Sequence, residues 1–364
     1  MGRGGEGGPE KATLPHSPGE NGGDKEKGRG GRNPSQVQGG GHALEVVGLP
    51  GFLFEGGGYR HQELLELVED LGGSVLQTRT IGTEVTITFF VPQEDVGVVE
   101  DLVRDLQGKL KRLPLMGSEI AVVSPTITRH HLPHPLCDVA EYLRREGAKT
   151  NMIGLARGPG QRTCQLGVEE RKLIEEHDAA VFVLGNFEHC LKEYKWKLFK
   201  DLSVPVIVTG GPELPSLPYA FSYISGMGRL PYRTRTFTEI GKLDEVARAV
   251  EKALEERRKK ISLDPPLLSP LVLKGEIENR LEEIRKCGAP LPVTPRLKGV
   301  RVKLPYSRFA GVLREMEVAG YRLGEIAEIR RSLMRDYILV DLLPLSRLEL
   351  SPKGVRAISG GMEV

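Results

Sequence analysis

The sequence predicts an α/β protein: a central doubly wound parallel sheet, flanked by two smaller α+β modules and preceded by a disordered N-terminal tail. Between residues 118 and 211, short apolar runs alternate with amphipathic runs. This alternation is typical of parallel strands covered by helices on both faces. Residues 1–42 are rich in glycine and contain almost nothing apolar to bury, which favours disorder.

Composition indicates a protein without membrane spans. The chain has 364 residues, enough for two or three domains, with 39% hydrophobic and 27% charged residues. Its net charge of +2 gives no general attraction to nucleic acid or to a membrane. No apolar run approaches the ~18 residues of a spanning helix, and the Gly-rich, charged N-terminus does not resemble a signal peptide. We therefore expect a cytoplasmic protein with no nucleic-acid or membrane partner.

Residues 43–114 are predicted to form a ferredoxin-like α+β module. We expect a strand at Ala43–Val47, a helix over the apolar stripe Leu64–Leu71, two strands within Ser74–Val91 and a second helix within Pro92–Leu113. The run Glu55-Gly56-Gly57-Gly58-Tyr59-Arg60 is not followed by the G-K-[ST] of a phosphate loop. A tight turn or a partner contact is the favoured interpretation of that run.

Residues 115–236 are predicted to form the parallel α/β domain. Its expected strands are Ile120–Val123, Met152–Leu155, Ala180–Leu184 and Val206–Val208, with helices at about 135–147, 167–177 and 189–201.

Residues 237–350 are predicted to be a linking helix and a second α+β module. The helix covers 238–261 and ends at Asp264-Pro265-Pro266. Further helices are expected at 274–286 and 306–316, and strands near Val300–Leu304, Gly324–Ile329 and Tyr337–Leu342. Residues 351–364 are expected to be a loose tail.

The stretch Ser124–Asp138 concentrates metal-capable side chains between a strand and a helix. Pro135 suits the first position of a helix, which places Cys137 in the first turn. A helix N-terminus favours the thiolate form of a nearby cysteine. His130, His131 and His134 lie in the preceding turn. Loops that leave the carboxyl ends of parallel strands form the ligand sites of such sheets.

A second cysteine falls at the same edge of the predicted sheet. Asn186 is a plausible N-cap, which puts His189 and Cys190 at the start of the next helix. If the four strands are ordered 2-1-3-4, Cys137 and Cys190 flank the point where helices leave to opposite faces. Candidate metal ligands are thus Cys137, Cys190, His130, His131, His134 and His189. Cys164 is a weaker candidate at this edge, and Cys287 reads as structural. Buried, inert cysteines remain an alternative.

Residues 124–158, beginning S-P-T-I-T-R-H-H-L-P-H-P-L-C-D, resemble the methanogenesis marker protein seven family, which is related to methyl-coenzyme M reductase operon protein C. Further matching motifs are V-F-V-L-G-N-F at 181–187, V-P-V-I-V-T-G-G at 204–211 and D-Y-I-L-V at 336–340. The resemblance spans about 43–345.

The resemblance implies a role in activating methyl-coenzyme M reductase, whose nickel tetrapyrrole must be reduced. The implied partners are that reductase, operon protein C, other methanogenesis marker proteins and an ATP-binding activation component. The implied cofactor is a nitrogenase-like iron–sulfur cluster shared with partner subunits. Cys137, Cys190 and His131 are the candidate cofactor-binding residues of this chain.

Three functions remain open from the sequence. The first is a non-catalytic subunit that helps to hold the cluster, since thiolates are soft donors that suit iron. The second is an enzyme in which Cys137 and either His131 or His134 form a thiol–imidazole pair that acts on a small substrate. The third is a scaffold without metal ligation, whose flanking modules bind partners.

Overall fold

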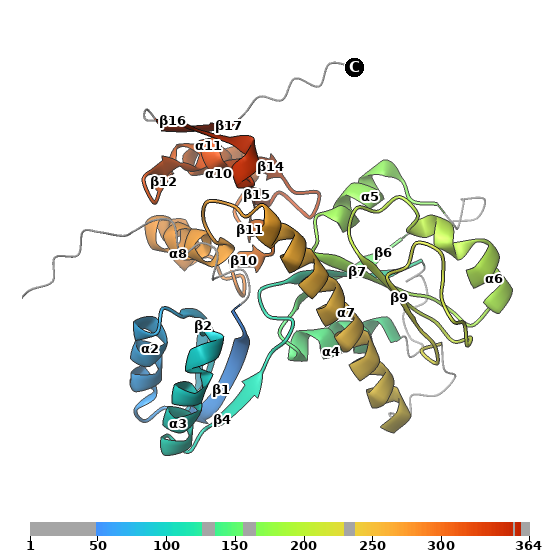
Figure 1. Cartoon of the computed structure of the whole chain (residues 1–364), viewed down its shortest axis with the longest axis horizontal. Coiled ribbons are helices and arrows are strands. Elements are labelled where there is room, and N and C mark those ends of the chain that lie inside the picture. The colour runs from blue at the N-terminus through green and yellow to red at the C-terminus, as the bar shows by residue number, and fades with distance from the viewer. Residues whose placement is uncertain (1–48, 126–134, 156–164, 229–236, 352–353, 358–364) are drawn as a thin grey trace, which may run out of the picture. The chain divides into compact units, whose positions relative to one another are not determined.

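The computed structural model describes residues 49–125, 135–155, 165–228, 237–351 and 354–357. It is a mixed α/β structure, with a five-stranded parallel sheet and antiparallel sheets on either side of it in the sequence (Figure 1). The predicted tail, the predicted strand Ala43–Val47 and three predicted site histidines lie outside the described residues. In the part that is described, no helix combines the length and apolar character needed to cross a bilayer.

The N-terminal sheet comprises four antiparallel strands in the order β2-β3-β1-β4. Its elements are β1 (Gly51–Gly57), α2 (His61–Asp70), β2 (Ser74–Ile81), β3 (Glu84–Phe90), η2 (Gln93–Asp95), α3 (Val96–Asp105) and β4 (Lys109–Arg112). This is the β-α-β-β-α-β order of ferredoxin-like motifs. Alternate residues of β1 and β3, among them Phe54, Ile87 and Phe89, are fully buried in a core shared with α2 and α3. The intervening residues line the opposite face.

Two expectations for this module hold only in part. The predicted tight turn covers only residues 58–60, where Arg60 has a φ of 61°. Glu55–Gly57 is the end of β1, where a Cβ on Gly56 would lie 2.5 Å from the Phe54 ring. Glycine is therefore required by close packing in a strand. The second predicted helix ends early, at Asp105, and β4 occupies Lys109–Arg112. The chain turns at Gln107, which has a φ of 54°.

The parallel sheet has the strand order β6-β5-β7-β8-β9. Its strands are β5 (Glu119–Ser124), β6 (Lys149–Gly154), β7 (Ala179–Val183), β8 (Val206–Thr209) and β9 (Ser222–Ile224). The first four have the order 2-1-3-4 on which the predicted switch point depends. The strand β9, which is only three residues long, was not predicted from the sequence. Every residue of β5, β7 and β8 is buried, as expected for strands covered on both faces.

Helices cover the two faces of this sheet (Figure 1). The helices α4 (Pro135–Arg145) and α7 (Phe237–Leu263) share one apolar core with β5 and β7. The helices α5 (Val168–Glu175) and α6 (Glu188–Glu193) contribute to the core on the opposite face. The predicted helix 189–201 is shorter than expected, because α6 gives way to the 3-10 segment η3 (Lys195–Leu198).

The C-terminal sheet is antiparallel with the order β10-β11-β15-β14. The elements of this module are α8 (Pro270–Arg280), α9 (Glu282–Lys286), β10 (Val293–Arg296), β11 (Gly299–Val302), α10 (Tyr306–Glu315), β12 (Glu317–Val318), β13 (Tyr321–Arg322), α11 (Leu323–Ile326), β14 (Ala327–Arg331), β15 (Ile338–Leu342), η4 (Leu345–Arg347), β16 (Leu348–Ser351) and β17 (Gly354–Ala357).

Four details of this module differ from the sequence prediction. One predicted helix, 274–286, is two helices that break at Leu281. The first half of the predicted strand Gly324–Ile329 is the short helix α11. The strand β10 was not foreseen. The tail predicted to be loose after Ser351 contains β17, which pairs with β16.

Candidate site at the carboxyl edge of the parallel sheet

Cys137 lies where the sequence predicted, in the first turn of α4. Pro135 is the first residue of this helix. Leu136, Val139 and Leu143 are buried against the sheet, while Cys137 is exposed and its thiol is free. The residues at the front of α4 thus present one accessible thiol beyond the carboxyl end of β5. The histidines at 130, 131 and 134, which precede it, fall outside the described residues.

Cys190 lies in α6, beyond the carboxyl end of the neighbouring strand β7. Its side chain is half-buried and its thiol is free. Phe187, not Asn186, is the N-cap residue, and it makes no side-chain capping hydrogen bond. The neighbouring His189 meets the ring of Tyr194 edge-on, with 5.8 Å between the ring centroids. The predicted ligand His189 therefore makes an aromatic contact within its own helical segment.

The two cysteines occupy the predicted switch point of the sheet. The strands β5 and β7 pair in parallel, and α4 and α6 belong to the cores on opposite faces. Within the described ranges, however, no three His, Cys, Asp or Glu side chains form a group suited to a metal ion. Cys164 is outside those ranges. Cys287 belongs to the C-terminal module, where its Sγ is 3.9 Å from the carbonyl oxygen of Lys303.

At the same edge of the sheet, two glycines pack tightly against Asn186. A Cβ on Gly211 would lie 2.5 Å from Asn186 Oδ1, and one on Gly228 would lie 1.8 Å from it. A Cβ on Gly210 would lie 2.7 Å from the hydroxyl oxygen of Tyr223. This hydroxyl donates to the carbonyl oxygen of Pro212 at 2.7 Å. Burial raises the pKa of Tyr223 to about 12. Close packing therefore explains the Gly210-Gly211 pair, and it fixes the loops beside Cys190.

The opposite, amino edge of the sheet carries a buried charge network that sequence reasoning missed. Glu119, at the start of β5, accepts hydrogen bonds from Arg301 Nε at 3.0 and 2.9 Å and from Asn151 Nδ2 at 2.8 Å. Arg301 Nη1 also donates to Glu176 Oε2 at 2.9 Å. All three charged side chains are at most 1% exposed. The network holds the C-terminal sheet against the amino ends of β5 and β7.

Further bonds extend this network. Glu176 accepts from the hydroxyl of Ser332 at 2.7 Å and from the backbone N–H of Leu333 at 2.7 Å. Asp178 accepts from the backbone N–H groups of Glu119 and Leu297. Burial raises the pKa of Glu119, but the charges of Arg301 and Arg296 lower it, and the net shift is downward. The carboxylate is thus held in its charged form inside the protein.

His177 completes the network as a neutral imidazole. Its Nδ1 lies 3.0 Å from the carbonyl oxygen of Leu173, which only accepts, so Nδ1 carries the proton. Its Nε2 then accepts from Asn151 Nδ2 at 3.0 Å. Burial lowers the pKa of His177, although Glu119 opposes this. The sequence does contain two signals: Glu119 begins an apolar strand, and Arg301 lies between two valines. Neither signal indicates its partner, which is distant in the sequence.

One comparison with known proteins identifies the family of this chain. The sequence model of the family described as methyl-coenzyme M reductase operon protein C matches residues 50–316. An uncharacterized protein of Methanocaldococcus jannaschii is 46% identical over 296 residues, which cover 81% of this chain and 94% of that protein. A solved structure of glutamyl-tRNA reductase from Methanopyrus kandleri aligns over 65% of this chain and 85% of that chain, at 9% identity. Its TM-score of 0.18 supports no common fold.

Proposed function

Because this chain belongs to the methyl-coenzyme M reductase operon protein C family, we propose that it works with methyl-coenzyme M reductase in methanogenesis as an accessory subunit without independent catalytic activity. The match covers the N-terminal and parallel sheets and reaches Met316 in the C-terminal module. The long alignment with an archaeal relative supports the same assignment for nearly the whole folded chain.

In this proposal the chain is a marker protein seven of methanogenic archaea and a cytoplasmic subunit of the ATP-dependent complex that reductively activates the reductase. Its partners are the reductase, operon protein C, other marker proteins and an ATP-binding component. The motifs at 124–158 and 181–187 carry this finer assignment. The first motif begins at the carboxyl end of β5 and the second ends just after β7, so both include residues of the candidate site.

The observation that carries the proposed site is the exposed thiol of Cys137 at the switch point. The described donors, Cys137 and the half-buried Cys190, are thiols of the kind that iron–sulfur clusters use. They are too few to hold a cluster alone, and an accessible thiol is suited to a cluster completed by a second subunit. Such a cluster would supply one-electron transfer toward the nickel centre of the reductase.

Iron analysis of the assembled complex tests this site. Complexes are purified with the wild-type chain, with Cys137→Ser and with Cys287→Ser, which removes a thiol of the C-terminal module. We expect Cys137→Ser to lower iron content and reductase activation, and Cys287→Ser to change neither. Iron content and activation that survive Cys137→Ser would exclude Cys137 as a ligand.

A scaffold without metal ligation is the second candidate, and an exposed aromatic residue favours it. Phe187, three residues before Cys190, is 81% exposed. A partner that covers this edge would bury that ring whether or not a cluster is present. The scaffold predicts that the complex still co-purifies when every cysteine is replaced by serine, and that Phe187→Ser weakens it. Loss of the complex on cysteine replacement would count against the scaffold.

A further inference from the structure

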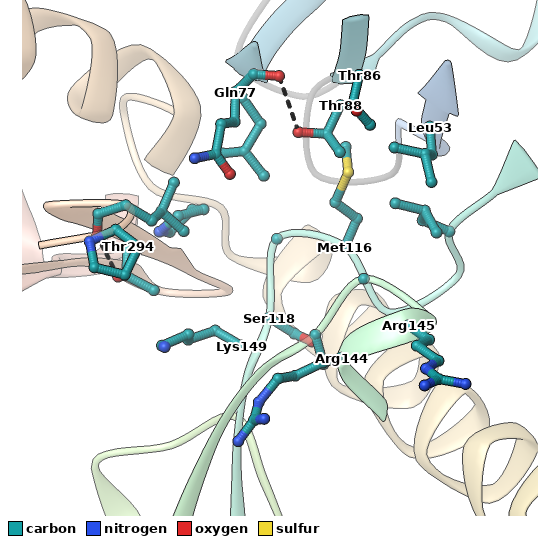
Figure 2. A pocket seen from close by; sticks show the side chains of 18 of the residues that line it. Leu53, Gln77, Thr86, Thr88, Met116, Ser118, Arg144, Arg145, Lys149 and Thr294 are labelled. Carbon is teal, nitrogen blue, oxygen red and sulfur yellow. Dashed lines mark hydrogen bonds between the residues drawn. The ribbon is translucent and has the colours of Figure 1, made fainter. Parts of the chain in front are cut away.

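A cavity of about 550 Å³ lies at the amino edge of the parallel sheet. Figure 2 shows Gln77, Thr86 and Thr88 of the N-terminal sheet on one side and Arg144 and Lys149 on the facing side. A third wall comes from the loop before β10 and the start of that strand, which contribute residues 290, 291, 294 and 295. The volume is that of an ordinary small-molecule site. This cavity is separate from the cysteine edge, and its function does not depend on the proposed one.

The described residues that line this cavity have an excess of positive charge. They include five cations and one carboxylate, Glu55; the cations are Arg79, Lys111, Arg144, Arg145 and Lys149. Three of these cations have carboxylate partners that do not line the cavity. Lys111 pairs with Glu146 at 2.9 Å, and Arg144 and Arg145 share Glu141 at 3.2 and 3.3 Å.

Lys149 differs from these cations. Its ammonium group makes no hydrogen bond or ion pair with any described residue, although the side chain is half-buried. Burial lowers its pKa; Glu119 opposes that shift and Arg144 adds to it. A half-buried ammonium without a direct counter-ion is the group that an anionic ligand would stabilise.

Lys303 does not line the cavity but contacts a residue that does. Its Nζ donates to the carbonyl oxygen of Pro290, a lining residue, at 2.5 Å. Burial, aided by Lys149 and Arg301 and opposed by Glu119 and Cys287, lowers the pKa of Lys303 to about 8. An anion beside Lys149 would raise the pKa of both lysines. Its binding near pH 8 would therefore take up protons.

The cavity also has an apolar wall. Its largest apolar side chains come from the three parts of the chain: Leu53, Leu76, Leu113, Met116 and Leu291. Cations beside an apolar wall match a ligand with an anionic group on an apolar body. We propose that this cavity binds a small phosphorylated molecule, with its phosphate at Lys149 and its apolar body against Leu53, Met116 and Leu291.

Calorimetry of the full chain at pH 8 with 1-naphthyl phosphate tests the proposal. We expect binding at least about tenfold tighter than that of inorganic phosphate or 1-naphthol, because each of those probes offers only half of the recognised chemistry. Titrations in buffers of different ionisation enthalpy are expected to show proton uptake. No detectable binding of 1-naphthyl phosphate, or equal binding of 1-naphthol, would overturn the proposal.

Two variants test whether the ligand binds in this cavity at Lys149. Lys149→Met is expected to weaken 1-naphthyl phosphate at least about tenfold without lowering the urea midpoint, because it removes an ammonium that has no direct partner. Lys109→Met, in β4 outside the cavity lining, is expected to bind as the wild type does. Equal weakening in both variants would show attraction to general positive charge and would refute this cavity as the site.

Discussion

Arg301 in β11 and Glu119 in β5 are 182 residues apart in sequence and form a buried ion pair, with 2.9 Å between Nε and Oε2. The same guanidinium reaches Glu176, so one cation bridges two carboxylates, while Arg296 and Arg330 lie farther off, 3.9 Å from Glu119 and Glu176 respectively. A pair of this kind does not add much stability relative to apolar residues, but removing one partner leaves charges buried without compensation. The contact therefore specifies where the C-terminal sheet docks.

Arg301→Met is expected to lower the free energy of unfolding by about 3–5 kcal/mol, because Glu119 and Glu176 would remain buried without the cation that they both hydrogen-bond. Urea unfolding measures the change. Arg104→Met is the control, since Arg104 pairs with Asp101 while both side chains are more than 70% exposed; its effect is expected to stay below about 1 kcal/mol. Adding Glu119→Gln and Glu176→Gln to Arg301→Met is expected to recover stability. No recovery would refute the charge argument.

His177 is expected to make the protein less stable in mild acid. Its folded pKa lies below its ordinary value of 6.5, so the unfolded state binds its proton first. The stability contribution of the neutral ring is complete above pH 6.5 and is lost as the pH falls toward the folded pKa. Glu119, with a pKa below 4.5, acts only at more acidic pH.

Urea midpoints between pH 7 and pH 5 test this dependence. We expect His177→Gln to flatten the slope and His189→Gln, on an exposed histidine, to leave it unchanged. A slope in His177→Gln equal to that of the wild type would assign the acid sensitivity to other groups.

Gly228→Ala is expected to lower stability by about 1–3 kcal/mol, because the added Cβ would meet Asn186 Oδ1 and the backbone of Gly211. Thermal unfolding gives the size of the effect. Gly241→Ala in α7, where a Cβ would meet nothing within 4 Å, is expected to stabilise by about 0.5–1 kcal/mol. If both substitutions stabilise, the glycines at this edge are not required by packing.

Cys137 is expected to react with iodoacetamide faster than Cys190 or Cys287, because only Cys137 of these three is exposed. Peptide mass spectrometry after short labelling of the isolated chain gives the order. In the assembled complex Cys137 is expected to be protected if a partner covers the switch point. Faster labelling of Cys190 in the isolated chain would contradict the described burial.

The sequence predicted the parallel sheet well because its signals are local. The apolar runs of β5, β7 and β8 and the amphipathic spacing of α4 need no knowledge of distant residues. Short or edge strands such as β9 and β10 lack such a signal. Cys137 was placed correctly for the same local reason.

The amino edge was not predictable by this route. The pairing of Arg301 with Glu119 and Glu176 depends on how the C-terminal sheet docks, which no periodicity encodes. In the sequence, Arg144 and Arg145 are also what is expected in the last turn of any helix, so they do not indicate a cavity. Only the docking of the N-terminal sheet beside them makes a cavity.

The buried network also has a consequence for synthesis of the chain on the ribosome. Glu176 is made 125 residues before its cation Arg301. At about 5–20 residues per second this interval is on the order of 6–25 s. During it, both carboxylates stay in water, and the amino edge of the parallel sheet has no cover from the C-terminal sheet. Final closure of that edge therefore awaits the last quarter of translation, so a truncated nascent chain would expose it to chaperones and proteases.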